Sequence, residues 1–86
     1  MTYQVLISKK ALKNLQKLSA FDNASVRKIL TALSINPRPR NSIKLASSDK
    51  YRVRVGNFRI IYTITDSELV VDVIDIDHRR KVYENL

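Results

Sequence analysis

The first third of the chain switches from an alternating pattern of apolar side chains to a helical one. Residues Thr2–Ile7 (TYQVLI) alternate and are rich in β-forming side chains, which predicts a strand. Ser8 then stands where an N-cap belongs, and the segment KKALKNLQKLS that follows places its apolar side chains on one helical face. The pattern therefore predicts a strand that runs directly into a helix.

A second helix is predicted after a connection of only three residues. Asp22 is expected to cap this helix, and the helix is expected to end near Ile35. Phe21 is expected to pack on Val26 as a hydrophobic staple. The apolar stripe that supports the helix consists of Val26, Ile29, Leu30 and Leu33. So short a connection favours a tight helical hairpin.

The second half of the chain has the short alternating runs of a β-sheet. Pro37 and Pro39 make residues 36–41 a loop, since proline removes a backbone donor and disfavours helical geometry in the residue before it. Polar turns then separate four predicted strands, at Ile43–Ala46, Tyr51–Val55, Phe58–Thr65 and Glu68–Ile76. The segment His78–Leu86 is expected to form a short helix or tail.

The resulting order, β-α-α-β-β-β-β-α, predicts an α+β fold in a single domain of residues 1–86. We expect the helical hairpin to cover one face of a mostly antiparallel sheet and to leave the other face bare. A functional site is then expected on the bare face.

The stretch YRVRVGNFRIIY places arginines on one face of a predicted hairpin. A two-residue turn at Gly56-Asn57 fixes the register of the flanking strands. The predicted pairs are Val55 with Phe58, Arg54 with Arg59, Val53 with Ile60, and Arg52 with Ile61. Like charges directly opposite each other destabilise a sheet, and such a violation tends to mark a functional site. Alternatively, the arginine stems lie on the sheet with their charged ends in water.

The same reasoning extends the register into the last strand. A two-residue turn at Asp66-Ser67 predicts that Ile64 pairs with Leu69 and places Arg59 beside Ile74. The last strand then ends near the Gly56-Asn57 turn, and Tyr83 follows Arg79 by one helical turn. We therefore expect a concave site at that end of the sheet, with His78 nearby. Its lining is expected to be Arg52, Arg54, Arg59, Arg79 and Tyr83.

The chain is strongly and unevenly basic. Its formal charge is +8, and residues 1–60 hold thirteen Lys and Arg against two acids, whereas residues 61–86 hold three against six. A basic excess of this size is typical of proteins with a polyanionic partner, although it also makes a soluble surface. Exposed cations that could contact a phosphate backbone, or simply be solvated, are Lys9, Lys13, Lys17, Arg38 and Arg40.

Other features narrow the class of protein. The chain has no cysteine, no apolar run near the ~20 residues of a membrane helix and no signal-peptide pattern, so we expect a cytoplasmic protein without a membrane partner. One histidine with scattered aspartates has no metal-ligand spacing, so no metal or other cofactor is expected.

The motif YRVRVGNFRIIYTI followed by VVDVIDIDHRRKVY resembles the RelE/ParE superfamily of toxins from toxin-antitoxin pairs, and the resemblance covers the whole chain. It implies a ribosome-dependent mRNA endonuclease that cuts codons in the A site of the small ribosomal subunit, with a RelB-like antitoxin that holds it inactive. Matching motif positions make Arg59 and Arg79 the catalytic arginines and Tyr83 the catalytic tyrosine. Arg52 and Arg54 match two basic strand positions that are lysines in the best-known RelE branch.

Cleavage of RNA without metal needs a base for the 2′-OH, positive charge for the phosphorane and an acid for the leaving 5′-oxygen. Arg59 is expected to clamp the transition state, and Arg79 to stabilise the leaving group. Tyr83 as phenolate and His78 are rival bases, and His78 could instead merely end the strand. The phosphate contacts expected around them are Arg52, Arg54, Lys50 and Arg80, with ribosomal RNA contacts at Lys9, Lys13, Lys17, Arg38 and Arg40.

Two functions from other classes compete with this interpretation. The ParE branch shares the fold but poisons DNA gyrase through protein contacts, and it usually lacks the full set of two arginines and a tyrosine. A nucleic-acid-binding module without catalysis would explain the charge but not the position of Tyr83. Inhibition of translation with intact replication would favour the endonuclease over both.

Overall fold

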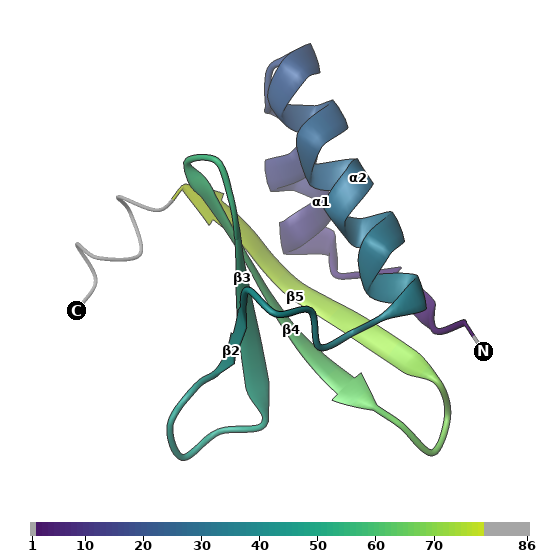
Figure 1. Cartoon of the computed structure of the whole chain (residues 1–86). Coiled ribbons are helices and arrows are strands. Elements are labelled where there is room, and N and C mark those ends of the chain that lie inside the picture. Colours follow the sequence, from purple (N-terminus) through teal and green to yellow (C-terminus); the bar gives the residue numbers. More distant parts are fainter. Residues whose placement is uncertain (1, 79–86) are drawn as a thin grey trace.

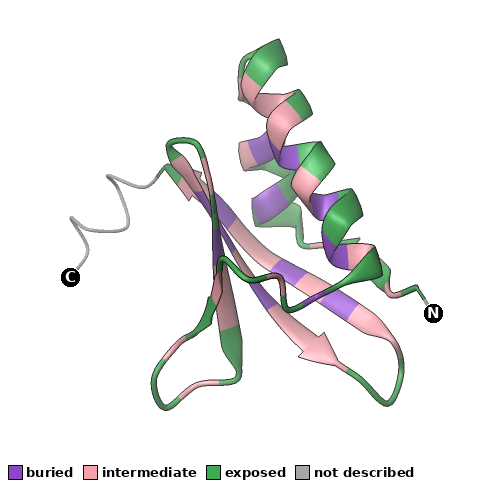
Figure 2. Cartoon of the chain, viewed as in Figure 1, coloured by how far each residue is buried: buried purple, intermediate pink, exposed green. Residues whose placement is uncertain are grey.

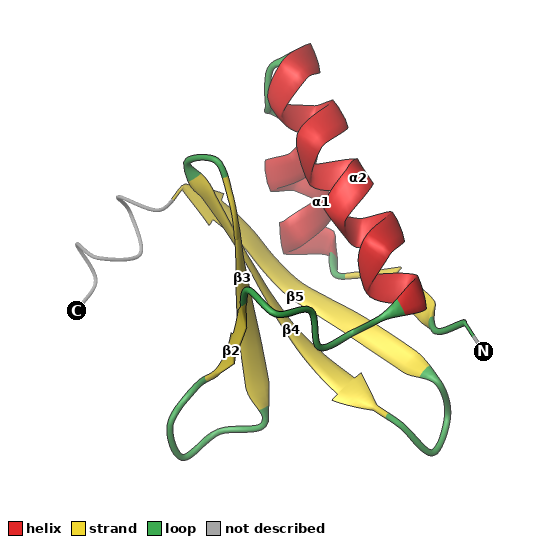
Figure 3. Cartoon of the chain, viewed as in Figure 1, coloured by secondary structure: helices red, strands yellow, loops and turns green. Residues whose placement is uncertain are grey.

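The computed structural model describes residues 2–78 and shows two helices packed against one face of a five-stranded sheet (Figures 1 and 3). The elements are β1 (Gln4–Ile7), α1 (Lys9–Gln16), α2 (Ala20–Ile35), β2 (Ser42–Lys44), β3 (Lys50–Val55), β4 (Phe58–Thr65) and β5 (Val70–His78). The strand order is β1-β5-β4-β3-β2, with β1 parallel to β5 and every other pair antiparallel. The predicted α+β fold is confirmed. The final helix or tail predicted after His78 lies outside the described residues.

Serine side chains start both helices. The Ser8 hydroxyl accepts a hydrogen bond from the Ala11 backbone N–H at 3.1 Å and donates one to the Ile74 carbonyl at 2.7 Å, so the predicted cap of α1 is confirmed. The cap predicted for α2 is wrong, because Ser19 holds that position and Asp22 lies in the first turn. The Ser19 hydroxyl accepts a hydrogen bond from the Asp22 N–H at 3.2 Å and donates one to the Asp22 carboxylate at 3.1 Å.

The predicted staple between Phe21 and Val26 is also wrong. Because α2 already begins at Ala20, Phe21 belongs to its first turn, and its side chain is 79% exposed. Val26 is instead fully buried in the core. The helix therefore gains its stability at this end from the Ser19 cap and from Val26, without a contribution from Phe21.

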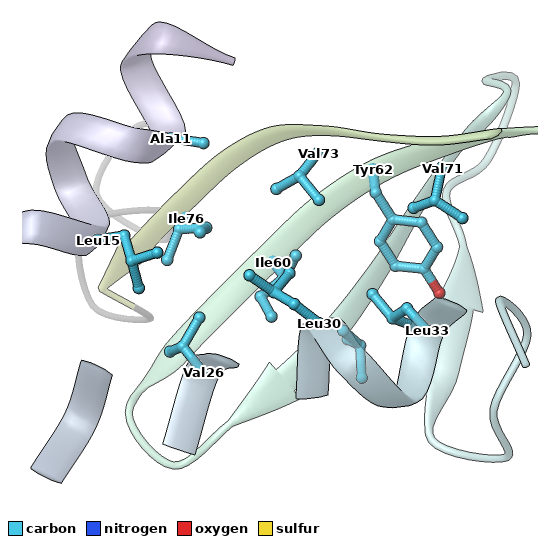
Figure 4. Close-up of a cluster of buried hydrophobic side chains, with 11 residues drawn as sticks. Ala11, Leu15, Val26, Leu30, Leu33, Ile60, Tyr62, Val71, Val73 and Ile76 are labelled. Atoms are coloured by element: carbon cyan, nitrogen blue, oxygen red, sulfur yellow. The ribbon is translucent and has the colours of Figure 1, made fainter. Parts of the chain in front are cut away.

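The hydrophobic core fills the space between the helices and the sheet (Figures 2 and 4). Its buried side chains are Ala11, Leu15, Val26, Leu30, Leu33, Val53, Ile60, Tyr62, Val71, Val73 and Ile76. The Tyr62 hydroxyl satisfies its polar end by donating to the Pro37 carbonyl at 2.7 Å. This bond anchors the proline loop to the core, and the opposite face of the sheet is left without a covering helix among the described residues.

The predicted strand register is confirmed in the β3–β4 hairpin and wrong between β4 and β5. Gly56 adopts a φ of +58°, and all four predicted pairs between β3 and β4 are present. Between β4 and β5, Thr65 pairs with Val70, and a bulge then changes the partner of Ile61 to Asp75. The longer turn and the bulge both displace β5, so Arg59 pairs with Asp77 and not with Ile74.

Candidate functional site

Four basic side chains lie on the sheet face that is turned away from the helices. They are Lys50, Arg52 and Arg54 of β3 and Arg59 of β4, and we call this side the arginine face. The neighbouring Val53 and Ile60 point the other way into the core, so strand alternation alone separates the two sets. Lys50 and Arg54 are exposed and Arg52 is half-buried. The hairpin thus concentrates positive charge on one surface.

Arg59 differs from the other cations because it is only 2% exposed. Its cross-strand neighbours are Arg54 in β3 and Asp77 in β5. A buried guanidinium loses its hydration, and this loss is costly unless nearby groups compensate its charge. The alternative prediction that the charged ends of the arginines lie in water is therefore wrong for Arg59, whose side chain contributes to the packing of the sheet.

His78 reaches the predicted end of the sheet but lies on the opposite face from the arginines. It pairs with Phe58, and the two rings meet edge to face with centroids 5.3 Å apart. Phe58 shares the helix-covered face with Val55 and Ile60. A shallow hollow of about 240 Å³ lies at this end of β5, lined by Asn14, Lys17, Leu18, Phe58, Ile76, Asp77 and His78. The structure thus separates His78 from Arg59 by the thickness of the sheet.

Three lysines at α1 are exposed on the surface, where they could contact a polyanion. Lys9, Lys13 and Lys17 are all exposed. Lys10, between them, instead forms an ion pair with Asp75 of β5 at 3.3 Å. The helix therefore carries two kinds of lysine, one engaged by the sheet and three that face solvent.

Arg38 is engaged within the molecule, although it was predicted as a contact for RNA. Its guanidinium donates to both Asp66 oxygens, at 3.2 and 2.8 Å, and its Nε donates to the Tyr51 hydroxyl at 3.2 Å. The Tyr3 hydroxyl donates to the same carboxylate at 2.6 Å. We call these four residues the corner cluster. Arg38 and then Tyr3 lower the pKa of Asp66 to about 2, because both hydrogen bonds favour its ionised form.

Of the remaining predicted site residues, the structure describes only Arg40. Arg40 is exposed in the proline loop. Arg79, Arg80 and Tyr83 lie outside the described residues. Asp77 was missed as a site residue, because the predicted register placed an isoleucine in its position opposite Arg59.

A second, larger hollow lies away from the arginine face. It has a volume of about 370 Å³ and is lined by Val5, Ile7, Leu12, Leu15, Arg27, Leu30, Thr31 and Ser34, on β1 and the two helices. Its lining is mostly apolar and includes one ionisable side chain, Arg27. This hollow therefore lacks the groups that acid–base chemistry requires.

Two further findings concern metals and membranes. Within residues 2–78, no group of three or more His, Cys, Asp or Glu side chains is placed to hold a metal ion. Over the same residues, neither helix is long and apolar enough to cross a membrane.

Known proteins resemble this chain in both sequence and structure. Residues 5–83 match the family of the ParE toxin of the type II toxin-antitoxin system parDE. A RelE1 toxin of Methanocaldococcus jannaschii is 30% identical over 89 residues, covering 99% of both chains. The solved archaeal RelE-RelB complex from Pyrococcus horikoshii has a toxin chain with a TM-score of 0.84 and 32% identity, covering 92% of this chain and 97% of that one.

A bacterial structure agrees with these relatives. The E. coli RelBE toxin-antitoxin complex has a TM-score of 0.77 and 28% identity, covering 88% of this chain and 95% of that one. The sequence match and the solved structures thus point to the same group of proteins through independent comparisons. This chain belongs to the RelE/ParE superfamily of type II toxins, and its relatives include RelE-like toxins.

Proposed function

We propose that the chain is a ribosome-dependent mRNA endonuclease that stops translation by cutting codons in the A site of the small ribosomal subunit. The observation that carries this proposal is the pairing of Arg54 with Arg59 on a sheet face that no described helix covers. Such a pair destabilises the sheet, and a phosphate group between the two guanidinium groups would relieve the repulsion. A phosphodiester is therefore the substrate group that fits this face best.

The chemistry assigned to the face is attack of the RNA 2′-OH on the adjacent phosphorus. Arg59, held in a fixed position by burial, would stabilise the phosphorane, with Arg52 and Arg54 around it. Arg79 would stabilise the charge on the leaving group. His78 is a poor base in this proposal, because its ring packs on Phe58 at the opposite face.

Binding to the ribosome would use cations outside the arginine face. Lys9, Lys13 and Lys17 project from α1 into solvent, and Arg40 is exposed in the proline loop. Contacts between lysine and phosphate give affinity without sequence information. Codon choice would therefore depend on the arginine face and on the ribosome, which can orient the 2′-OH for in-line attack.

A RelB-like antitoxin is the proposed protein partner. The solved relatives from Pyrococcus horikoshii and E. coli are complexes of RelE with RelB. An acidic or amphipathic segment would be attracted to the arginine face, where residues of β3 and β4 carry four positive charges. Occupation of this face would exclude the mRNA from Arg59.

Cleavage on programmed ribosomes tests the proposal directly. Purified toxin is mixed with ribosomes that hold a defined codon in the A site, and the mRNA is mapped by primer extension. We expect cleavage within the A-site codon, and no cleavage when the same mRNA is offered without ribosomes. Intact mRNA under both conditions would refute the endonuclease.

Gyrase poisoning is the second candidate function, because the matched family is that of the ParE toxin of parDE. A gyrase poison would leave translation intact and block supercoiling by purified gyrase. Both assays on one protein preparation separate the candidates. The endonuclease predicts mRNA cleavage with unchanged supercoiling, and the gyrase poison predicts the reverse.

A further inference from the structure

The register of β5 brings a carboxylate into the arginine face. Asp77 pairs directly with Arg59, and Arg54 pairs with Arg59 from the other side. Directly paired side chains of an antiparallel sheet lie on the same face, with Cβ atoms about 4.5–5.5 Å apart. A row of Arg54, Arg59 and Asp77 thus crosses three neighbouring strands. We propose that Asp77 is the general base of the cleavage reaction, an assignment that rests on the proposed function.

The arginine face needs a proton acceptor, and its cations cannot supply one. Arginine stays protonated in proteins, so Arg52, Arg54 and Arg59 cannot accept the 2′-OH proton. His78 lies on the other face, against Phe58. By register, three carboxylates lie on the described part of the arginine face: Asp72 pairs with Thr63, Asp75 with Ile61 and Asp77 with Arg59. Asp72 lies far along the strand, and Asp75 is engaged by Lys10 and Asn14 of α1. Asp77 alone of these three lies beside Arg59.

The Asp77 carboxylate is held in one orientation. Its Oδ1 accepts a hydrogen bond from the backbone N–H of His78 at 2.8 Å, and the residue is half-buried. This bond fixes the carboxylate at the end of β5 and leaves Oδ2 as the oxygen that would meet a substrate hydroxyl. A base held in advance by the backbone needs no rearrangement when the substrate binds.

The proton and the electrons balance in a single displacement. The proton of the 2′-OH moves to Oδ2 of Asp77, while the 2′-oxygen forms a bond to the adjacent phosphorus. The bond from phosphorus to the 5′-oxygen breaks, and the leaving oxygen takes a proton from a solvent water. The products are a 2′,3′-cyclic phosphate and a 5′-hydroxyl end. Asp77 serves as the base and returns its proton to solvent afterwards.

A different role for Asp77 predicts effects of the opposite sign. If the carboxylate only balances the charge of Arg54 and Arg59, its removal makes the face more positive. RNA would then bind more tightly, and cleavage would continue at an equal or higher rate. A base, in contrast, is needed for the chemical step, so its removal lowers the rate whatever happens to affinity.

Single-turnover cleavage by Asp77→Asn on programmed ribosomes decides between these roles. We expect the rate to fall by roughly 10²–10⁴-fold, the usual contribution of a general base, while ribosome affinity stays equal or increases. Asp72→Asn is the matched control, since it removes a half-buried carboxylate from the same strand and face, and it should keep the wild-type rate. A wild-type rate for Asp77→Asn would overturn the assignment.

Two further measurements keep the test decisive if Asp77→Asn folds poorly. Asp77→Glu should retain part of the rate, because it restores a carboxylate at the same strand position.

The wild-type rate should also not rise between about pH 6 and about pH 9, whereas a phenolate base would make it rise with hydroxide concentration. A rising rate would overturn the assignment. If wild-type toxin leaves ribosome-bound mRNA intact, the proposed function itself fails; if it cuts equally without Asp77, only this inference fails.

Discussion

At the scale of the residue, we expect the pair of Arg54 and Arg59 to lower the stability of the fold in return for the proposed phosphate binding. Arg54 is exposed and Arg59 is buried, and they occupy directly opposed positions in β3 and β4. Directly opposed like charges cost a sheet part of the ~0.2–1 kcal/mol that a favourable pair would contribute. A substitution that removes the exposed charge, that of Arg54, should therefore stabilise the fold and lower the activity of the proposed endonuclease.

Arg54→Thr tests this exchange. We expect the melting temperature to rise by roughly 1–5 °C, because the repulsion disappears and threonine favours strands, while the cleavage rate falls. Arg52→Thr is the control, since Arg52 pairs with Ile61 and not with a second cation. Thermal unfolding and ribosome cleavage are measured for both variants. A lower melting temperature for Arg54→Thr than for Arg52→Thr would contradict the argument.

His78→Ala should leave cleavage within about threefold of wild type, since the ring lies on the helix-covered face and cannot reach a phosphate on the other side. Tyr83→Phe should lower the rate by at least tenfold, because it removes the hydroxyl of the catalytic tyrosine that the family resemblance implies. Rates are compared at neutral pH under single turnover. A large loss in His78→Ala with none in Tyr83→Phe would transfer the proton chemistry to the histidine.

At the scale of the element, the sequence predicts best where a turn has a single outcome. The Gly56-Asn57 turn specifies both its length and its strand register, and the arginine face follows directly from it. The β4–β5 connection could not be predicted in the same way, because Leu69 adopts a backbone φ of +54°, which residues other than glycine seldom adopt. The bulge beside Ile61 also leaves no mark in the alternation of apolar residues.

The wrong register predicted for β5 also affected the predicted chemistry of the site. It hid the pairing of Asp77 with Arg59 and left the predicted site without a carboxylate. Burial of Arg59 was missed for a related reason, since alternation assigns a side chain to a face but does not predict how deeply neighbouring side chains cover it. Arg79, Arg80 and Tyr83 lie outside the described residues, and their places in the site remain predictions.

The corner cluster predicts how stability depends on pH. Asp66 has a pKa of about 2 in the folded chain, below the ~3.9 of an unfolded aspartate. Its ion pair with Arg38 therefore stabilises the fold fully above about pH 4, and this contribution disappears as the pH falls towards 2. Urea unfolding should show Asp66→Asn less stable than wild type at neutral pH, with most of this difference lost by about pH 2.

Asp49→Asn is the control, because Asp49 is exposed in the loop between β2 and β3. It should change stability little at either pH. A difference between wild type and Asp66→Asn that persists undiminished at the lower pH would mean that the cluster does not depend on charge. Arg38 would then return to the set of cations available for RNA.

At the scale of the whole molecule, basic charge surrounds the chain well beyond its site. Thirteen of the sixteen Lys and Arg residues lie within residues 1–60, together with only two acids. The cations are distributed over α1, the proline loop and the arginine face. Such a distribution raises the rate of encounter with a polyanion from many directions, and the ribosome is the polyanion that the proposed function requires.

The salt dependence of ribosome binding separates the lysines that bind RNA from those that serve the fold. Replacing Lys9, Lys13 and Lys17 by Gln should weaken binding for all codons alike and leave the ratio of cleavage rates between codons unchanged, since phosphate contacts carry no sequence information. Each lost phosphate contact should reduce the slope of log affinity against log salt by roughly 0.7–0.9. Lys10→Gln is the matched control, because Lys10 lies on the same helix but pairs with Asp75, and it should leave the slope unchanged while lowering stability slightly. Equal slopes for wild type and the triple variant would show that the lysine row is only a solvated surface, and binding would then have to depend on the arginine face.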